Sequence, residues 1–230
     1  MKKKVAIFDV DGTVFRSSLL IELVKALIEK GIFPRNAEKE FEREERRWQN
    51  REGDYETYIR AIIEVFMNHI KGVPYGAFAD VSEVVVKKNG KRLYRYTRDL
   101  VLSLKKRGYF LLAISQSPKG ILDKFCKSLG FDKVYGRIYE LGPNDEFTGV
   151  VVDEHLIANK SNIVKRAIEK ENLTLTGSIG VGDTEGDIPV LEMVEKAICF
   201  NPNAKLLKIA KINKWNVIVE RKDVIYTIAP

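Results

Sequence analysis

The sequence predicts an α/β fold with a largely parallel sheet, helices on both faces of that sheet, and a helical cap inserted after the first strand. Beyond residue 96, short apolar segments alternate with amphipathic helical segments, the pattern of βαβ units. Residues 5–8 form a further strand-like run, separated from that region by residues 17–95, where the apolar periodicity is helical. We therefore expect a core domain of residues 1–16 and 96–230 and a cap domain of residues 17–95.

The composition is that of a globular protein. Of the 230 residues, 45% are hydrophobic and 31% are charged, which excludes collagen-like and disordered classes. No apolar run approaches the roughly 20 residues that a membrane-spanning helix needs, and the run at 5–8 is too short for a signal peptide. Cys126 and Cys199 lack the spacing of a metal site. We expect a cytoplasmic protein with two reduced, buried thiols and no membrane contact.

The first strand and the cap are predicted from two different patterns. Residues 5–8 are rich in strand formers and end at Asp-Val-Asp-Gly, which suits a strand buried on both faces. In the cap, apolar stripes at helical spacing predict helices near residues 19–28, 41–48 and 55–70. The two histidines, His69 and His155, are far apart in the sequence, and we expect structural or surface roles for both.

The remaining core elements alternate strictly. A helix over 93–107 ends at Gly108 and precedes a strand over 109–114. Ser117 as N-cap and Pro118 at the first helical position then begin a helix that ends at Gly130. The later elements are a short strand at 134–135, a hairpin of 137–140 with 147–152, helices over 160–170, 188–194 and 203–212, and strands over 178–181, 197–200 and 216–219.

The formal net charge of +7 comes from one segment of the chain. Residues 87–107 contain nine Lys or Arg side chains and one acid, Asp99, whereas the rest of the chain is close to neutral. A basic segment of this kind can engage nucleic acid or acidic lipid. Its apolar residues, however, follow the spacing of an amphipathic helix, which favours a solvated helix face. We therefore do not expect nucleic acid as a partner.

Polar side chains follow three of the predicted strands, and one lysine begins a helix. They are Asp9, Asp11, Ser115, Lys160, Asp183 and Asp187. Ligands of open parallel sheets bind at the carboxyl ends of the strands, so these side chains are expected to converge. The spacing of two residues also starts the Asp9 and Asp11 carboxylates on the same side of the extended chain.

The chemistry of this set predicts a phosphoryl site with a divalent cation. Converging carboxylates repel one another unless a cation neutralises part of their charge, and oxygen ligands without His or Cys favour Mg²⁺ over zinc. A serine hydroxyl, backbone N–H groups at a helix start and a lysine hold phosphate oxygens. A carboxylate that remains available can attack phosphorus.

These residues resemble the motifs of a known family. Asp9-Val-Asp-Gly-Thr13, Ser115, Lys160 and Gly182-Asp-Thr-Glu-Gly-Asp187 resemble, in order and spacing, the four motifs of the haloacid dehalogenase (HAD) superfamily of Mg²⁺-dependent phosphatases. The helical insertion looks like the cap of type I members. Ser115-Gln-Ser-Pro118 and the later Asn201-Pro-Asn…Trp215-Asn-Val-Ile218 are similar to the phosphoserine phosphatase-like branch, subfamily IB. The resemblance spans nearly the whole chain and implies a Rossmann-like core.

The resemblance implies the catalytic and metal-binding roles. Asp9 would be the nucleophile that forms an aspartyl phosphate, and Asp11 would protonate the leaving group and then deprotonate water. The Asp9 carboxylate, the Asp11 backbone carbonyl and Asp183 would hold Mg²⁺. Asp187 would orient Lys160 or a metal-bound water.

The substrate-binding residues expected from the same resemblance are Ser115, Gln116 and Lys160. An arginine of the cap can bind a substrate carboxylate, and Arg60 is the candidate. Two departures argue against carrying over phosphoserine specificity. Phosphoserine phosphatases typically place a glutamate shortly after the first motif, where this chain has Arg16, Ser17 and Ser18, and Gly186 stands where an Asn usually precedes the last Asp.

The expected function is hydrolysis of a small phosphorylated metabolite. One alternative is phosphotransfer to another hydroxyl compound on the same fold. The other is a non-catalytic protein that binds anions or nucleic acid. The sequence defines neither the substrate nor the oligomeric state.

Overall fold

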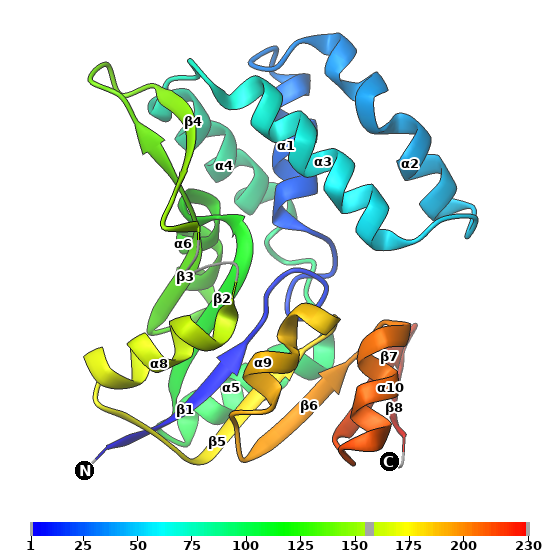
Figure 1. The fold of residues 1–230 in the computed structure, drawn as a ribbon, viewed down its shortest axis with the longest axis vertical. Helices are drawn as coiled ribbons and strands as arrows, with labels where there is room; N and C mark the ends of the chain where they lie inside the picture. The colour runs from blue at the N-terminus through cyan, green and yellow to red at the C-terminus, as the bar shows by residue number, and fades with distance from the viewer. Residues whose placement is uncertain (1, 155–158, 229–230) are drawn as a thin grey trace.

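An eight-stranded sheet forms the centre of the computed structural model, which describes residues 2–154 and 159–228 (Figure 1). His155 lies outside the described residues. The strand order is β4-β3-β2-β1-β5-β6-β7-β8. The strands are β1 (Lys3–Phe8), β2 (Phe110–Pro118), β3 (Lys133–Leu141), β4 (Phe147–Val152), β5 (Leu173–Gly182), β6 (Lys196–Phe200), β7 (Asn216–Arg221) and β8 (Val224–Ile228).

The sheet is parallel from β3 to β7, and the two edge strands, β4 and β8, are antiparallel to their neighbours. Strand β1 lies between β2 and β5. Its alternate residues enter two separate cores: Ala6 and Phe8 pack on one face, and Val5 and Ile7 on the other. All four are fully or almost fully buried, as predicted for a strand covered on both faces.

Helices cover both faces of the sheet, which confirms the predicted fold class. One face packs against α5 (Arg95–Lys106) and α6 (Lys119–Leu129). The other packs against α8 (Lys160–Lys170), the short α9 (Ile188–Leu191) and α10 (Ala204–Ile212). Cys126 and Cys199 are buried free thiols, as expected. In the two described ranges, no helix has the length and apolar character that a bilayer-spanning segment requires.

Four helices lie together at the carboxyl ends of the strands, at the top of Figure 1, and are called the cap helices below. They are α1 (Leu19–Glu29), α2 (Lys39–Gln49), α3 (Tyr55–Ile70) and α4 (Tyr75–Asn89), with the 3₁₀ turn η1 (Arg35–Glu38) before α2. Helices α1 and α3 each bury an apolar stripe, whereas α2 buries only Phe41. The charged sequence around α2 is therefore a solvated helix, as its interleaved acids and bases indicate.

Two chain segments connect the cap helices to the core, and they lie side by side. Arg16 donates its N–H to the Arg92 carbonyl at 2.8 Å, and Tyr94 donates to Val14 at 3.1 Å. The first segment follows the end of β1, and the second precedes α5. The division into a core of residues 1–16 and 96–230 and a cap of 17–95 remains a proposal, which these paired connections support.

The β3–β4 hairpin makes a third connection between the sheet and the cap helices. Gly72 donates to the Phe147 carbonyl at 2.8 Å, and Phe147 donates back to Val73 at 3.0 Å. The ring of Phe147 packs edge-on to Phe78 of α4, with centroids 5.1 Å apart. In Figure 1 the hairpin rises beside α3 and α4. The cap helices are therefore attached at the hairpin as well as at their chain connections.

The basic segment 87–107 lies at the end of α4, in the following connection and in α5. Several of its charges are paired: Lys87 with Glu83 at 2.7 Å, and Arg92 with Glu22 at 2.9 Å. Helix α5 buries Thr97, Val101 and Leu104 and exposes its basic residues. This arrangement agrees with the predicted solvated, amphipathic helix.

One predicted boundary is wrong. The Ser117-Pro118 pair was expected to begin a helix, but β2 continues through Pro118, which pairs with Arg137 of β3, and α6 begins at Lys119. The reason is that the Ser117 hydroxyl donates to Asp11 at 2.8 Å instead of capping a helix. A tertiary hydrogen bond replaces the local one that the N-cap pattern predicts.

Other elements differ in extent from the prediction. Strand β3 is continuous where a short strand and a separate hairpin arm were expected, β5 begins earlier, and α9 is shorter. Helix α4 was not identified as a separate stripe, because the adjacent valines Val84 and Val85 place apolar side chains on both its exposed and its buried side. Strand β8 was not predicted, and it completes the far edge of the sheet after a turn in which Lys222 has a φ of 55°.

The packing between α4 and the hairpin makes a testable prediction. Phe78 is 2% exposed and contacts Phe66, Tyr75 and Phe147. Phe78→Ala should lower the free energy of unfolding by about 3–5 kcal/mol, because it removes a large buried ring and leaves a cavity. The control is Val84→Ala on the same helix, 45% exposed, which should change it by less than about 0.5 kcal/mol. Equal effects in urea titrations of both variants would contradict the assigned packing.

Candidate active site

The carboxyl ends of β1 and β5 bring two acidic segments into contact. Asp9 follows β1 and donates its N–H to Val181 of β5 at 2.9 Å. Gly12 has a φ of 79°, and a Cβ atom there would lie 2.2 Å from Asp183 Oδ2. Only glycine fits this turn without displacing Asp183. The close approach fixes the Asp9–Asp11 segment against the segment that follows β5.

A buried ion-pair chain joins Asp9 to Asp187. Lys160 is the first residue of α8, and its Nζ lies 2.6 Å from Asp9 Oδ1 and 2.7 Å from Asp187 Oδ1. The exposed fractions of the Lys160, Asp9 and Asp187 side chains are 8%, 9% and 4%. Asp187 Oδ2 in turn accepts hydrogen bonds from the N–H groups of Asp183 and Thr184. Asp187 therefore holds both Lys160 and the backbone that carries Asp183.

The charges in this cluster are only partly balanced. Burial raises the pKa of Asp9 to about 7, and the nearby Asp187 and Asp11 act in the same direction against Lys160. Burial and the carboxylates of Asp9 and Asp187 also hold the pKa of Asp183 well above its usual range. Burial alone would lower the pKa of Lys160, but Asp187 and Asp9 outweigh it and raise that pKa. One ammonium thus faces three carboxyl groups.

This arrangement fits a hard divalent cation. Ligand oxygens of Asp9, Asp183 and Asp187 lie within 4.8 Å of one another. Asp9 Oδ2 is buried and has no hydrogen-bond partner among the described residues. An unpaired buried carboxylate oxygen is costly, and a cation would satisfy it. An all-oxygen donor set is the type that Mg²⁺ prefers.

Asp11 lies apart from that group of three. Its Oδ1 accepts from the N–H of Leu19, the first residue of α1, at 2.5 Å. Its Oδ2 accepts from the hydroxyls of Ser115 and Ser117, which the end of β2 presents. Asp11 therefore contacts both the cap helices and the strand that carries the predicted phosphate-binding serine.

Two predicted substrate-binding residues lie outside this cluster. Gln116 is exposed and accepts from Arg137 of β3 at 2.7 Å. The Arg60 side chain is 67% exposed and pairs with Glu56 one turn earlier in α3 at 3.1 Å. The structure therefore brings Asp9, Asp183, Asp187 and Lys160 together, and Asp11 with Ser115, but it does not place Arg60 in contact with them.

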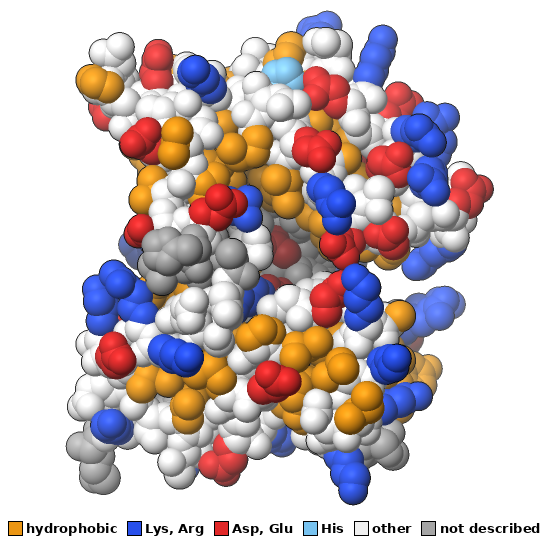
Figure 2. Space-filling view, viewed as in Figure 1, with side chains coloured by type: hydrophobic (Ala, Val, Ile, Leu, Met, Phe, Trp, Pro, Cys, Tyr) orange, Lys and Arg blue, Asp and Glu red, His pale blue; other side chains and the backbone are white. Residues whose placement is uncertain are grey.

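Sequence reasoning missed a residue of the cap helices whose pKa the carboxylates affect. Tyr55 is the first residue of α3, and its ring packs on Trp48 with centroids 5.3 Å apart. Burial raises its pKa above the usual value, and the charges of Asp11, Asp183 and Asp9 raise it further. In the sequence Tyr55 is one member of an apolar stripe, so no local signal separates it from packing residues. Figure 2 shows the hollow between the cap helices and the sheet, with acidic and basic side chains along its rim.

Most of the chain matches the model of a known protein family. The model for haloacid dehalogenase-like hydrolases matches residues 6–192. The chain belongs to this family. The matched range contains Asp9, Lys160 and Asp187, the residues of the buried ion pairs. The predicted resemblance is confirmed.

Relatives of this HAD-family hydrolase include proteins named as phosphatases. A phosphoserine phosphatase of Archaeoglobus fulgidus is 26% identical over 94% of this chain, but the chain spans only 58% of that protein. A histidinol-phosphatase of Neisseria meningitidis serogroup C is 25% identical over 94% of this chain and 98% of its own length.

Solved structures share the fold of the HAD-family hydrolase. A protein of unknown function from Bordetella pertussis superposes with a TM-score of 0.71 at 18% identity, covering 94% of this chain and 98% of its own. A phosphoserine phosphatase in apo form gives a TM-score of 0.62 at 23% identity and covers 96% of each chain. At these identities the likeness establishes the fold.

The raised pKa values predict a pH dependence in this hydrolase. The pKa of Asp9 is about 7 in the folded, metal-free protein and ordinarily 3.8, so this carboxyl group binds more protons in the folded than in the unfolded state between about pH 4 and 7. The contribution of Asp9 to the free energy of unfolding is therefore fully present below about pH 4 and is lost as the pH rises to about 7. The measurement is the free energy of unfolding against pH without metal. Asp9→Asn should flatten the slope, and an unchanged slope would contradict the assignment.

Gly12 provides a test of the candidate metal site. Gly12→Ala should weaken Mg²⁺ binding by about tenfold or more, because the added methyl group displaces the Asp183 carboxylate. Gly31→Ala is the matched control: Gly31 has a φ of 70°, but nothing lies within 4 Å of its Cβ position. Both substitutions place alanine at a positive φ and so carry similar backbone strain. The Mg²⁺ affinity of each variant is measured by calorimetric titration, and an equal loss of affinity in both would contradict the steric argument.

Proposed function

We propose that this chain is a Mg²⁺-dependent phosphomonoester hydrolase that acts on a small phosphorylated metabolite. The observation that carries the proposal is the asymmetry of Asp9: Lys160 holds Oδ1, whereas Oδ2 is buried without a partner among the described residues. Family membership and the phosphatase names of the matched relatives support it. Asp9, the Asp11 backbone carbonyl and Asp183 would hold the ion, which when bound would offset the charge of the carboxylates and the phosphate.

In the proposed first step, an Asp9 carboxylate oxygen attacks phosphorus. The bond from phosphorus to the ester oxygen breaks, and the leaving alkoxide takes a proton from Asp11. Lys160 fixes the nucleophile and adds positive charge beside the phosphate oxygens. The fixed geometry removes most of the orientational cost of the attack.

In the second step, water attacks the aspartyl phosphate. Asp11 accepts a proton from the water, the bond between phosphorus and Asp9 breaks, and inorganic phosphate leaves. In the described conformation Asp11 accepts from Ser115 and Ser117. Turning Asp11 towards the ester oxygen would release both hydroxyls, which would then donate to phosphate oxygens. The two serines thus serve alternately the acid and the substrate.

The substrate class is approached with a defined panel. Phosphoserine and histidinol phosphate, after which the relatives are named, are both primary phosphate esters of amino alcohols, and sugar phosphates and nucleotides provide contrast. Phosphate release from each compound is measured with Mg²⁺ and with EDTA. Adding a second alcohol tests the alternative of phosphotransfer, which would form a new ester faster than inorganic phosphate.

The nucleophile assignment makes a direct prediction. Asp9→Asn should lower kcat for p-nitrophenyl phosphate by about 10³-fold or more, because the amide oxygen cannot form the aspartyl phosphate. Asp123→Asn is the control, since Asp123 pairs with Lys119 on the outside of α6. It should retain wild-type activity. Full activity of the Asp9→Asn enzyme would refute the proposed role.

A further inference from the structure

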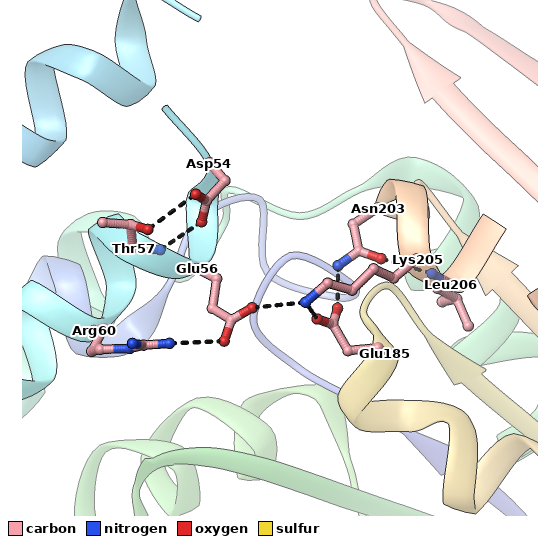
Figure 3. Close-up of polar contacts among 8 residues, drawn as sticks. All are labelled: Asp54, Glu56, Thr57, Arg60, Glu185, Asn203, Lys205 and Leu206. Atoms are coloured by element: carbon pink, nitrogen blue, oxygen red, sulfur yellow. Dashed lines mark hydrogen bonds and ion pairs between the residues drawn. The ribbon is translucent and has the colours of Figure 1, made fainter. Parts of the chain in front are cut away.

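Lys205, at the start of α10, connects the core to the cap helices. Its Nζ donates to Glu185 at 2.6 Å and to Glu56 of α3 at 3.3 Å (Figure 3). Glu185 lies between Asp183 and Asp187, in the segment that supplies the candidate metal ligands. One ammonium group therefore joins that segment to the cap helices, across 149 residues of sequence from Glu56.

The core side of this bridge is fixed by a second residue. Asn203 is the N-cap of α10 and accepts from the N–H of Leu206 at 2.9 Å. Its side-chain amide donates to Glu185, and its backbone N–H donates to the Asp183 carbonyl at 2.9 Å. The start of α10 and the 183–187 segment are thus one hydrogen-bonded unit (Figure 3).

The cap side is equally defined. Asp54 caps α3 by accepting from the N–H and the hydroxyl of Thr57, at 2.8 and 3.0 Å. Arg60 contacts the second oxygen of Glu56 at 3.1 Å. The first turn of α3 is therefore ordered, and Glu56 points from it towards Lys205 (Figure 3).

Tyr55 is the neighbour of Glu56 in this turn. It packs on Trp48, and the charges of Asp11, Asp183 and Asp9 raise the pKa of its hydroxyl beyond the effect of burial. A movement of the first turn of α3 therefore also moves Tyr55 relative to these carboxylates. The Glu56–Lys205 contact opposes such a movement.

We propose that Lys205 is a positioning residue that fastens the first turn of α3 to the 183–187 segment by bridging Glu56 and Glu185. This inference rests on the proposed function only for its kinetic consequence. The side chains of Lys205, Glu56 and Glu185 are 68%, 55% and 31% exposed, so water and salt screen the bridge. A weak, screened ion pair opens and re-forms readily, so this contact can hold α3 without fixing it permanently.

The test replaces the charge and follows the cap directly. Lys205→Met removes the bridge, and Lys208→Met removes a charge from the same helix at an exposed residue with no ion pair among the described residues. Spin labels at Arg43→Cys in α2 and Lys211→Cys in α10 report the distance between cap and core, while Cys126 and Cys199 are buried. Lys205→Met should broaden this distance distribution, and Lys208→Met should not.

The kinetic readout separates positioning from a merely structural role. KM should rise about two- to fivefold in Lys205→Met, which corresponds to the free energy of an exposed ion pair. We expect a smaller change in kcat, because bound substrate itself holds the cap closed. Glu56→Gln should reproduce the effect, and the double variant should add nothing further. Lys205→Arg should restore the wild-type KM. In about 0.5 M salt, the KM of the wild type should approach that of Lys205→Met, because salt screens the ion pair.

The outcomes distinguish this inference from the proposed function. If no phosphate ester is hydrolysed but the distance distribution broadens in Lys205→Met, the proposed function fails and the fastening role stands. If the wild type is active and Lys205→Met matches Lys208→Met in both distance distribution and KM, the fastening role is refuted.

Discussion

The candidate active site depends on the ion pairs that the ammonium group of Lys160 makes with Asp9 and Asp187. Carboxyl groups of Asp9, Asp183 and Asp187 lie within 4.8 Å of one another in a buried place, where their mutual repulsion is strong. Lys160 lies between two of them and meets both at hydrogen-bond distance. Removing one member of a buried ion pair leaves an uncompensated charge, so none of these residues can be replaced independently of the others. The same imbalance is the one that the proposed cation would offset.

The sheet explains why this cluster forms where it does. Parallel strands end at one edge, and the centre of the sheet, at β1 and β5, receives the two acidic segments. Helix α8 then begins at that edge and presents Lys160 from its first turn. Gly12 allows the segment after β1 to contact Asp183 in the segment after β5. Backbone geometry thus concentrates the acidic side chains before any ligand is considered.

Much of the core could be predicted from the sequence, because strand ends, helix starts and acidic pairs are local features. Asp9, Asp183 and Lys160 were identified in this way. Tyr55 was not, because an aromatic residue in an apolar stripe carries no local sign of what it faces. The Glu56–Lys205 contact joins residues 149 positions apart, and nothing in either segment identifies the other. Ser117 shows the opposite failure: a sound local rule predicted a helix N-cap, and a hydrogen bond to Asp11 took its place.

The β3–β4 hairpin changes how the cap helices can move. Besides the two connecting segments, the hairpin adds a third attachment, because Gly72 donates its N–H to the Phe147 carbonyl and Phe147 donates its own to Val73. In Figure 1 this attachment lies on the side of the sheet opposite α10. A rotation of the cap helices about the hairpin contact would leave these backbone bonds intact. It would separate α3 from α10, where the exposed Glu56–Lys205 ion pair joins them.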